Sequence, residues 1–460
     1  MNVFSQLKSM DRKKVGEETL AFFRHFFNSY PFYIFQLLLA CAFVFLHKEV
    51  EGALVFALLI SAILIVCDDI LPTTLPFLMI SIFTTNCYDS FDQFIGLVIF
   101  APIPVAAFLY HFIFYRKPIR FGDSVWGLFA VGFAVTLGGF GGFTLKEYAR
   151  GSYYILGLGF GMLGTYYLMK SEFAPQRKYD IKERFSVIMC LAGSLCVAMI
   201  LIGYFQRSLG WKFPYYAYGF SPNNLSTNLM FAMPFGLYLS KKNRYFAVFA
   251  PIMYLAICLT GSRGGFLFGT VEFWVCCVYW VLQGKRRTLR LFVCIGVNIL
   301  ILSLFGTGFL TLLLDRLGSF HSIKSEVRYT MILQSIENFC ENPLVGTGIL
   351  DDSIAYGDFN KQGTMTWYHM MIPQIVGSMG LLGIVAYGYQ FYGRVKLIFT
   401  KPNTWSLCLG ISYLGVLLMS QVNPGEFCPL PFTLLAVLLF IFQENRLERH
   451  CYPLWNQPIS

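Results

Sequence analysis

The chain has 460 residues, of which 56% are hydrophobic and only 13% are charged, against about 25% charged residues in ordinary soluble domains. No water-soluble fold hides that much apolar surface, and the same composition excludes an intrinsically disordered protein. The formal charge of +10 would suit a nucleic-acid partner, but its distribution along the chain argues against one. The composition predicts an all-α polytopic membrane protein. There is no Cys-x-x-Cys pair, so no metal site is predicted.

About 14 apolar stretches are long enough, or nearly so, to cross a hydrocarbon core of about 30 Å. In chain order they lie near residues 31–47, 52–67, 70–86, 94–115, 124–143, 151–169, 185–206, 223–240, 245–260, 265–283, 291–313, 370–393, 404–420 and 427–443. Two pairs of neighbouring stretches have short connectors, so the sequence predicts about 12–14 transmembrane helices. No cleavable signal peptide is expected, because the first 30 residues are polar or amphipathic.

The orientation follows from Lys and Arg, which concentrate in cytoplasmic loops. With a cytoplasmic N-terminus, the inside segments hold 25 of the 35 basic residues and the outside segments hold 10. The positive charge is therefore a topogenic signal, and no nucleic-acid partner is predicted. The predicted organisation is a cytoplasmic segment at 1–30, transmembrane helices over 31–313, an external loop at 314–369, further transmembrane helices over 370–443 and a cytoplasmic tail at 444–460.

The external loop at 314–369 has a pattern of its own. From Ser325 to Glu341, apolar residues recur at spacings of three and four, which is typical of an amphipathic helix. Asn342-Pro343 should end this helix, and two glycines follow in a short turn. We expect the helix to lie along the outer membrane surface with its apolar side toward the lipid.

Several motifs lie on one predicted side of the membrane. Gly261-Ser262-Arg263-Gly264-Gly265 opens a span, and Ser221-Pro222-Asn223-Asn224 opens another. Arg328 precedes Asn342-Pro343-Leu344-Val345-Gly346-Thr347-Gly348 within the loop, and His369 stands directly before the next span. Over roughly residues 205–395 this ordered set resembles the O-antigen ligase and O-antigen polymerase family of bacterial integral membrane glycosyltransferases. The family often has Asn directly after this His, where the present chain has Met370.

The resemblance implies an enzyme that uses a glycan linked to a polyprenyl diphosphate. Such enzymes transfer the glycan to a hydroxyl of a glycan or lipid acceptor at the outer face of the plasma membrane. No cofactor and no metal is expected, and the partners are the lipid-linked donor, the acceptor and membrane lipids. The resemblance also implies an external active site, and the basic residues predict that both termini are cytoplasmic.

The family's chemistry suggests a role for four residues. A departing diphosphate needs fixed cations, and arginine binds phosphate through a bidentate fork, which favours Arg263 and Arg328, with Arg207 next. The acceptor hydroxyl needs a base, and His369 is placed for that role. Structural alternatives remain open: the arginines as membrane-interface anchors or as the polar edge of a surface helix, and the histidine as a helix cap.

Three further polar residues are substrate-binding candidates. Asn223 and Asn224 lie at the outer end of a span, where the alternative is that they cap a helix opening at Leu225. Glu272 is the one charged residue well inside a predicted span, so it should face the bundle interior with a partner or be protonated.

A lipid-linked glycan flippase or exporter is the main rival function. A transport path predicts ionisable residues or internal repeats along the membrane interior, and Glu272 is the only such residue found. Within the enzyme class, ligase and polymerase differ in the acceptor, which the sequence does not identify.

Overall fold

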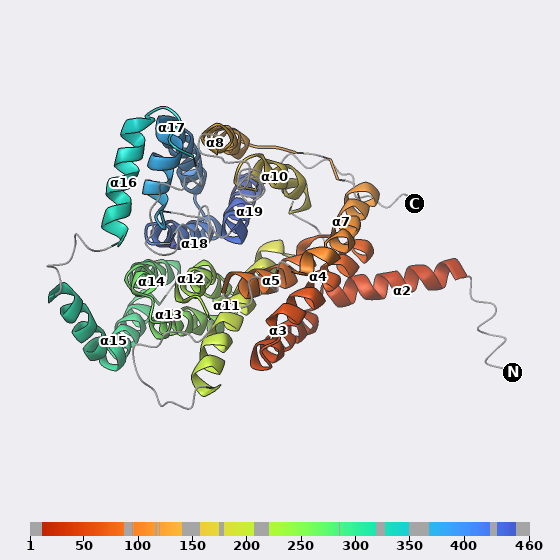
Figure 1. Cartoon of the computed structure of the whole chain (residues 1–460). Coiled ribbons are helices and arrows are strands. Elements are labelled where there is room, and N and C mark those ends of the chain that lie inside the picture. Colours follow the sequence, from red (N-terminus) through yellow and green to blue (C-terminus); the bar gives the residue numbers. More distant parts are fainter. Residues whose placement is uncertain are drawn as a thin grey trace.

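The computed structural model describes residues 12–86, 94, 96–115, 117–118, 120–139, 157–173, 179–206, 220–284, 286–318, 327–348, 368–423 and 430–447. These residues form a bundle of helices without a β-strand (Figure 1). In chain order the helices are α2 (Arg12–Phe27), α3 (Tyr30–Phe45), α4 (Glu49–Val66), η1 (Leu71–Thr73), α5 (Thr74–Asn86), η3 (Leu97–Phe100), α7 (Pro102–Phe114), α8 (Ser124–Gly139), α10 (Phe160–Glu172), α11 (Ile181–Gln206), α12 (Pro222–Leu239), η5 (Arg244–Val248), α13 (Phe249–Leu259), α14 (Arg263–Gln283), α15 (Arg287–Gly318), α16 (Val327–Glu341), α17 (Met371–Phe399), α18 (Thr404–Met419) and α19 (Leu430–Leu447).

The all-α polytopic fold is confirmed. In the described part of the chain, five helical segments are long and apolar enough to cross a membrane: α4, the η3–α7 segment, α11, α14 and α17. A sixth is obtained if α2 and α3, which meet at 61°, count as one bent span. The larger number of 12–14 spans stays a prediction, although α8, η5–α13 and α18 are further apolar helices of shorter length.

Helix α12 forms the centre of the bundle. Nearly all of its side chains are buried, and it packs against α11, α13, α14 and α18. In Figure 1 these helices lie together in the middle of the molecule, with α17 and α8 beyond α18. The helices that contribute the candidate residues are therefore grouped around α12.

Helices α8 and α17 pack against each other in antiparallel directions. Gly127 faces Gln390 and Gly138 faces Met379, and a Cβ added at either glycine would come within about 3 Å of the opposite helix. Small residues at such contacts let two helix backbones approach closely. Helices α8 and α17 therefore form a closely packed pair, and α17 provides the span that begins beside His369.

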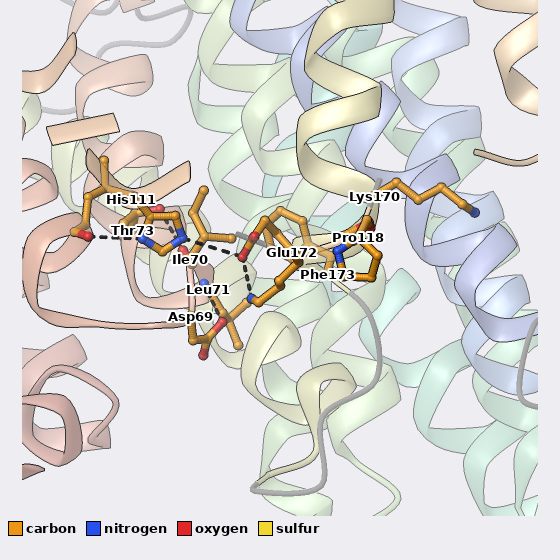
Figure 2. A network of polar contacts seen from close by, with 12 residues as sticks. Asp69, Ile70, Leu71, Thr73, His111, Pro118, Lys170, Glu172 and Phe173 are labelled. Atoms are coloured by element: carbon orange, nitrogen blue, oxygen red, sulfur yellow. Dashed lines mark hydrogen bonds and ion pairs between the residues drawn. The ribbon is translucent and has the colours of Figure 1, made fainter. Parts of the chain in front are cut away.

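A buried ionic network joins α7, α10 and, through the carbonyl of Leu64, α4 (Figure 2). The Glu172 carboxylate pairs with Lys117 at 2.5 Å and lies 3.6 Å from His111 Nε2. Lys170, on the same helix as Glu172, points the other way and pairs with Glu444 of α19 at 2.7 Å. Buried charges are tolerated when paired in this manner, so the network fixes α10 between the first helices and the last one.

Candidate functional site

The end of α18 is a junction where other helices begin. The backbone N–H of Met371, at the start of α17, donates a 2.8 Å hydrogen bond to the carbonyl of Ser420. Gly264, in the first turn of α14, approaches Val422 so closely that an added Cβ would lie 2.4 Å from a methyl carbon of the valine. The first turns of α17 and α14, which are far apart in sequence, therefore meet at one place.

Polar side chains bring the start of α12 to the same junction. Asn423 Nδ2, just after α18, donates a 2.9 Å hydrogen bond to Asn224 Oδ1. Asn224 Nδ2 donates to the carbonyl of Thr85 at 2.6 Å, which ties the cluster to the end of α5. The Ser262 hydroxyl donates a 2.6 Å bond to Asn223 Oδ1, which joins the starts of α14 and α12 directly.

The convergence has an electrostatic consequence. The first turns of α12, α14 and α17 all lie in this region. Each helix N-terminus carries a partial positive charge of roughly half an elementary charge, and helix N-termini commonly bind phosphate groups. The region is therefore suited to an anion, before any cationic side chain is considered.

Arg263 is the first residue of α14, and its side chain is exposed. Ser262 precedes it as the N-cap, and its Oγ accepts the N–H of Gly265 at 2.9 Å. Gly265 must be small, since an added Cβ would lie 2.3 Å from Ser226 Oγ of α12. In this motif the serine caps the helix, the glycines allow close helix contact, and the arginine is left facing outward.

His369 is held in an unusual backbone conformation. Its φ of 48° lies in the left-handed region, which histidine adopts more readily than most residues. The side chain is exposed, whereas the flanking Tyr368 and Met370 are buried. Tyr368 is fixed from two sides, because its N–H donates to Gln374 Oε1 at 3.0 Å and its hydroxyl accepts from Asn338 Nδ2 at 2.7 Å. Met370, and not His369, occupies the N-cap position of α17.

The segment after α16 docks onto a break in α17. Gly380 has φ 56° and ψ −149°, which is not helical and which only glycine adopts without strain. Backbone hydrogen bonds run both ways across the break: Thr347 N–H to Gly377 O (3.0 Å), Gly348 N–H to Ser378 O (3.0 Å), Leu381 N–H to Pro343 O (2.8 Å) and Leu382 N–H to Leu344 O (3.0 Å). The carbonyl and amide groups freed by the break are thus satisfied, and α16 is attached to the helix that begins beside His369.

Helix α16 matches the expected amphipathic helix and ends at Glu341, directly before Asn342-Pro343. Its buried face is formed by Met331, Ser335 and Asn338, which lie against the protein. The apolar residues Tyr329, Ile332, Leu333 and Ile336 are exposed. This arrangement leaves an apolar stripe for lipid, as expected of a surface helix, and the position on the membrane stays a prediction. Arg328 lies in the first turn, and its side chain is outside the described part.

The structure separates the roles of the two asparagines at the start of α12. Ser221 is the N-cap, and its Oγ accepts the N–H of Asn224 at 3.3 Å, so the alternative that the asparagines cap the helix is wrong. Both ends of the Asn224 carboxamide are bonded within the protein. Asn223 Oδ1 is also bonded, and its Nδ2 has no hydrogen-bond partner among the described residues.

Glu272 lies away from the junction. It is fully buried on α14, about 14 Å along the helix axis from Arg263. Its carboxylate lies against Gly415 of α18, where an added Cβ would be 2.4 Å away. Neither oxygen has a hydrogen-bond partner in the part of the chain that the structure describes, so Glu272 faces the bundle interior as expected but without the expected partner there. Arg207 falls outside the described residues.

Two features of the junction were not predicted from the sequence. Asn423 belongs to Gln421-Val422-Asn423, a segment that follows a predicted span on the outer side. This position was the only sequence feature that could have indicated a role at the site. The link from Asn338 to Tyr368 had no sequence signal, since neither residue stands in a recognisable motif. Among the described residues, no group of three His, Cys, Asp or Glu side chains lies close enough to hold a metal ion.

A comparison with protein families gives one match. The family model described as O-antigen ligase matches residues 246–388, roughly a third of the chain. The matched region contains Arg263, Arg328 and His369 together with the segment that docks on the break in α17. No curated protein matches the chain. The chain is thus a polytopic membrane protein whose residues 246–388 match the O-antigen ligase family.

Proposed function

We propose that this protein transfers or polymerises a polyprenyl-diphosphate-linked glycan onto an acceptor hydroxyl at the outer face of the bacterial plasma membrane, without a metal ion. The observation that supports this most is the convergence of three helix N-termini at the end of α18. Arg263 stands at one of these N-termini and His369 directly precedes another. The family match covers both residues.

In this proposal the diphosphate of the donor binds at the junction. The bond between the anomeric carbon and the diphosphate oxygen breaks, and the negative charge on the leaving oxygen increases in the transition state. The Arg263 guanidinium and the helix N-termini stabilise that charge without rearrangement. Arg328, on the helix attached to α17, is the second proposed cation, and Arg207 the third.

On the acceptor side, the hydroxyl oxygen forms the new bond to the anomeric carbon and loses its proton. His369 is the proposed base, because its imidazole is exposed next to the start of α17. The buried residues on either side hold the backbone at this point, so the ring is oriented before the acceptor arrives.

The amide side chains have different proposed parts. Asn223 is the better candidate for a sugar contact, since its Nδ2 is available within the described part of the structure. Asn224 and Asn423 hold the helix ends in position and act on the substrate through that geometry. Glu272 lies in a helix–helix contact, which gives no support to a role as a substrate ligand or to a transport path.

Arginine substitution tests the proposal. Arg263→Ala should lower the rate of glycan transfer roughly 10²–10³-fold, and Arg263→Lys should not restore it, because lysine lacks the planar fork. Arg244→Lys, at an exposed turn before α13, is the matched control and should keep the wild-type rate. All variants need equal amounts in the membrane. Near-normal transfer by Arg263→Lys would reduce Arg263 to an interface anchor.

The reaction itself separates the candidate functions. Purified protein in vesicles with a lipid-linked glycan and an acceptor should release polyprenyl diphosphate as the product forms. An exporter would move the intact donor and release none. In cells, deletion of the gene should leave long lipid-linked chains if the protein is a ligase, and single repeat units if it is a polymerase.

A further inference from the structure

A second site lies at the far end of α17 from His369. A cavity of about 360 Å³ is bounded by the start of α8, by the last turns of α17 and by α19. Helix α17 is broken at Gly380, and its second part, Leu381–Phe399, is about 28 Å long at 1.5 Å per residue, close to the thickness of a hydrocarbon core. His369 precedes its first residue, and Arg394 and Lys396 line the cavity near its end. The cavity therefore belongs to the opposite membrane face.

The cavity has a fixed positive charge. Arg394 is only 5% exposed, and its Nη1 donates a 2.6 Å hydrogen bond to the Tyr413 hydroxyl. The guanidinium carbon lies 5.0 Å from the ring centres of both Tyr413 and Phe440, so the two rings hold the group in place. Lys396 is exposed at the edge, and Asp123 is the acidic residue there. These three side chains leave one net positive charge.

A buried hydroxyl points to a missing ligand. Ser124 lines the cavity at the first turn of α8, and its Oγ is buried with no hydrogen-bond partner among the described residues. The Ser124 N–H is already used, since it donates to Glu444 Oε1 at 2.6 Å, and Lys170 neutralises that carboxylate. A buried hydroxyl without a partner costs stability, and a ligand oxygen would satisfy it.

The surroundings of the cavity suit a lipid rather than a soluble molecule. Trp126 and Tyr392, which line it, are 61% and 64% exposed, and such aromatic residues are typical of the membrane–water interface. From this level, exposed apolar side chains continue along both helices toward the membrane centre: Phe129 and Phe133 on α8, and Val385 and Leu381 on α17. Polar groups that can bind a phosphate are thus next to a surface that can contact acyl chains.

We propose that this cavity binds the phosphate headgroup of an anionic phospholipid, from the leaflet opposite the proposed active site. The Arg394 and Lys396 side chains supply the charge, Ser124 Oγ donates to a phosphate oxygen, and the acyl chains lie against α8 and α17. This inference goes beyond the proposed function and does not depend on it.

Thermal unfolding of the purified protein tests the proposal, with phosphatidylglycerol, phosphatidylcholine or inorganic phosphate added in the same detergent. Phosphatidylglycerol should raise the unfolding temperature, and the other two should not. Lys396→Gln should weaken the apparent affinity for phosphatidylglycerol roughly fivefold, which corresponds to one basic residue at an anionic surface. Lys401→Gln removes the same charge from an exposed position that does not line the cavity, and its effect should stay below about twofold.

Ser124→Ala provides a variant whose folding should not be at risk. Its hydroxyl bonds to nothing in the described part of the protein, so the lipid-free unfolding temperature should be unchanged or higher, while phosphatidylglycerol binding weakens. Equal losses with Lys396→Gln and Lys401→Gln would overturn the site in favour of diffuse attraction to a basic surface. Equal stabilisation by inorganic phosphate would overturn the lipid assignment. Equal stabilisation by phosphatidylcholine would overturn the charge requirement.

Discussion

Asn423 Nδ2 donates a 2.9 Å hydrogen bond to Asn224 Oδ1, and this contact joins the end of α18 to the first turn of α12. The two residues are 199 positions apart in the chain. Because Asn224 also donates to Thr85, one carboxamide positions the ends of three helices. The orientation of the helix N-termini at the junction depends on this small network.

The first prediction concerns that network. Asn423→Ala removes a donor and leaves Asn224 Oδ1 without its partner. The loss should destabilise the arrangement of helix ends at the junction by about 1–2 kcal/mol and lower turnover roughly tenfold. Gln421→Ala is the control, because the Gln421 side chain, just after α18, donates to the carbonyl of Leu417 in the last turn of that helix and not to α12. Glycan transfer at equal protein levels is the measurement. Equal rates for the two variants would show that the junction tolerates loss of the contact.

A second prediction concerns the break in α17. Gly380→Ala places a Cβ 2.7 Å from the Pro343 carbonyl oxygen in a backbone conformation that alanine rarely adopts, so it should destabilise the protein by about 1–3 kcal/mol and detach α16. Gly388→Ala, on the same helix, meets nothing within 4 Å and should be neutral or slightly stabilising. Thermal unfolding and protease cleavage within residues 314–369 measure the difference. Similar stability of both variants would contradict the docking role of Gly380.

A third prediction separates the backbone role of His369 from its chemistry. His369→Asn keeps a residue that tolerates the left-handed conformation but removes the base, so stability should be retained while turnover falls roughly 10²–10⁴-fold. Donor binding should stay within a few fold of wild type. If donor binding is lost together with turnover, His369 belongs to the diphosphate site instead.

A fourth prediction concerns sidedness. Cys340, on α16, is the one exposed cysteine in the described part of the chain. In a variant that keeps only this cysteine, an impermeant maleimide should label right-side-out vesicles without permeabilisation. A single cysteine at the other end of α17, introduced as Lys401→Cys, should be labelled only after permeabilisation. The reverse pattern would place the junction on the cytoplasmic side and remove the proposed external site.

A fifth prediction uses the buried carboxyl of Asp69, which lies between α4 and η1 and outside the helices that can span the membrane. Burial raises its pKa from 3.8 to about 6, although the Leu71 N–H and Lys117 act in the opposite direction. Between about pH 4 and 6 the folded protein therefore holds a proton that the unfolded chain has lost, so stability falls as pH rises through this window and stays lower above it.

Asp69→Asn removes that penalty and still accepts the Leu71 N–H, so it should stabilise the protein by about 1–3 kcal/mol at pH 8 and by much less at pH 4. Glu337→Gln, at an exposed position of α16, is the control and should leave both values unchanged. Unfolding temperatures at the two pH values are the measurement. If Asp69→Asn raised the unfolding temperature equally at both pH values, the buried charge of Asp69 would not be the cause of the gain in stability.

The sequence by itself determined the helical membrane fold and most helix positions. A long apolar stretch predicts a helical span, because backbone N–H and C=O groups in lipid must form their hydrogen bonds within the helix. Helices α12 and α18 begin and end within one residue of the predicted stretches. The amphipathic helix before Asn342 was also predictable, because its spacing of three and four residues and the following proline are local signals. Arg263 and His369 became candidate site residues through ordered motifs along the chain.

Only the tertiary structure decided which helix ends meet. The contact of Asn423 with Asn224 joins distant parts of the chain, and no local pattern predicts such a pair. The break at Gly380 exists because residues 343–348 bond to the backbone groups that it frees, so it depends on packing rather than on propensity. The same holds for Ser124, whose buried hydroxyl faces a cavity formed by three separate helices. Side-chain identity sets what each residue can bind, whereas long-range packing sets where it lies.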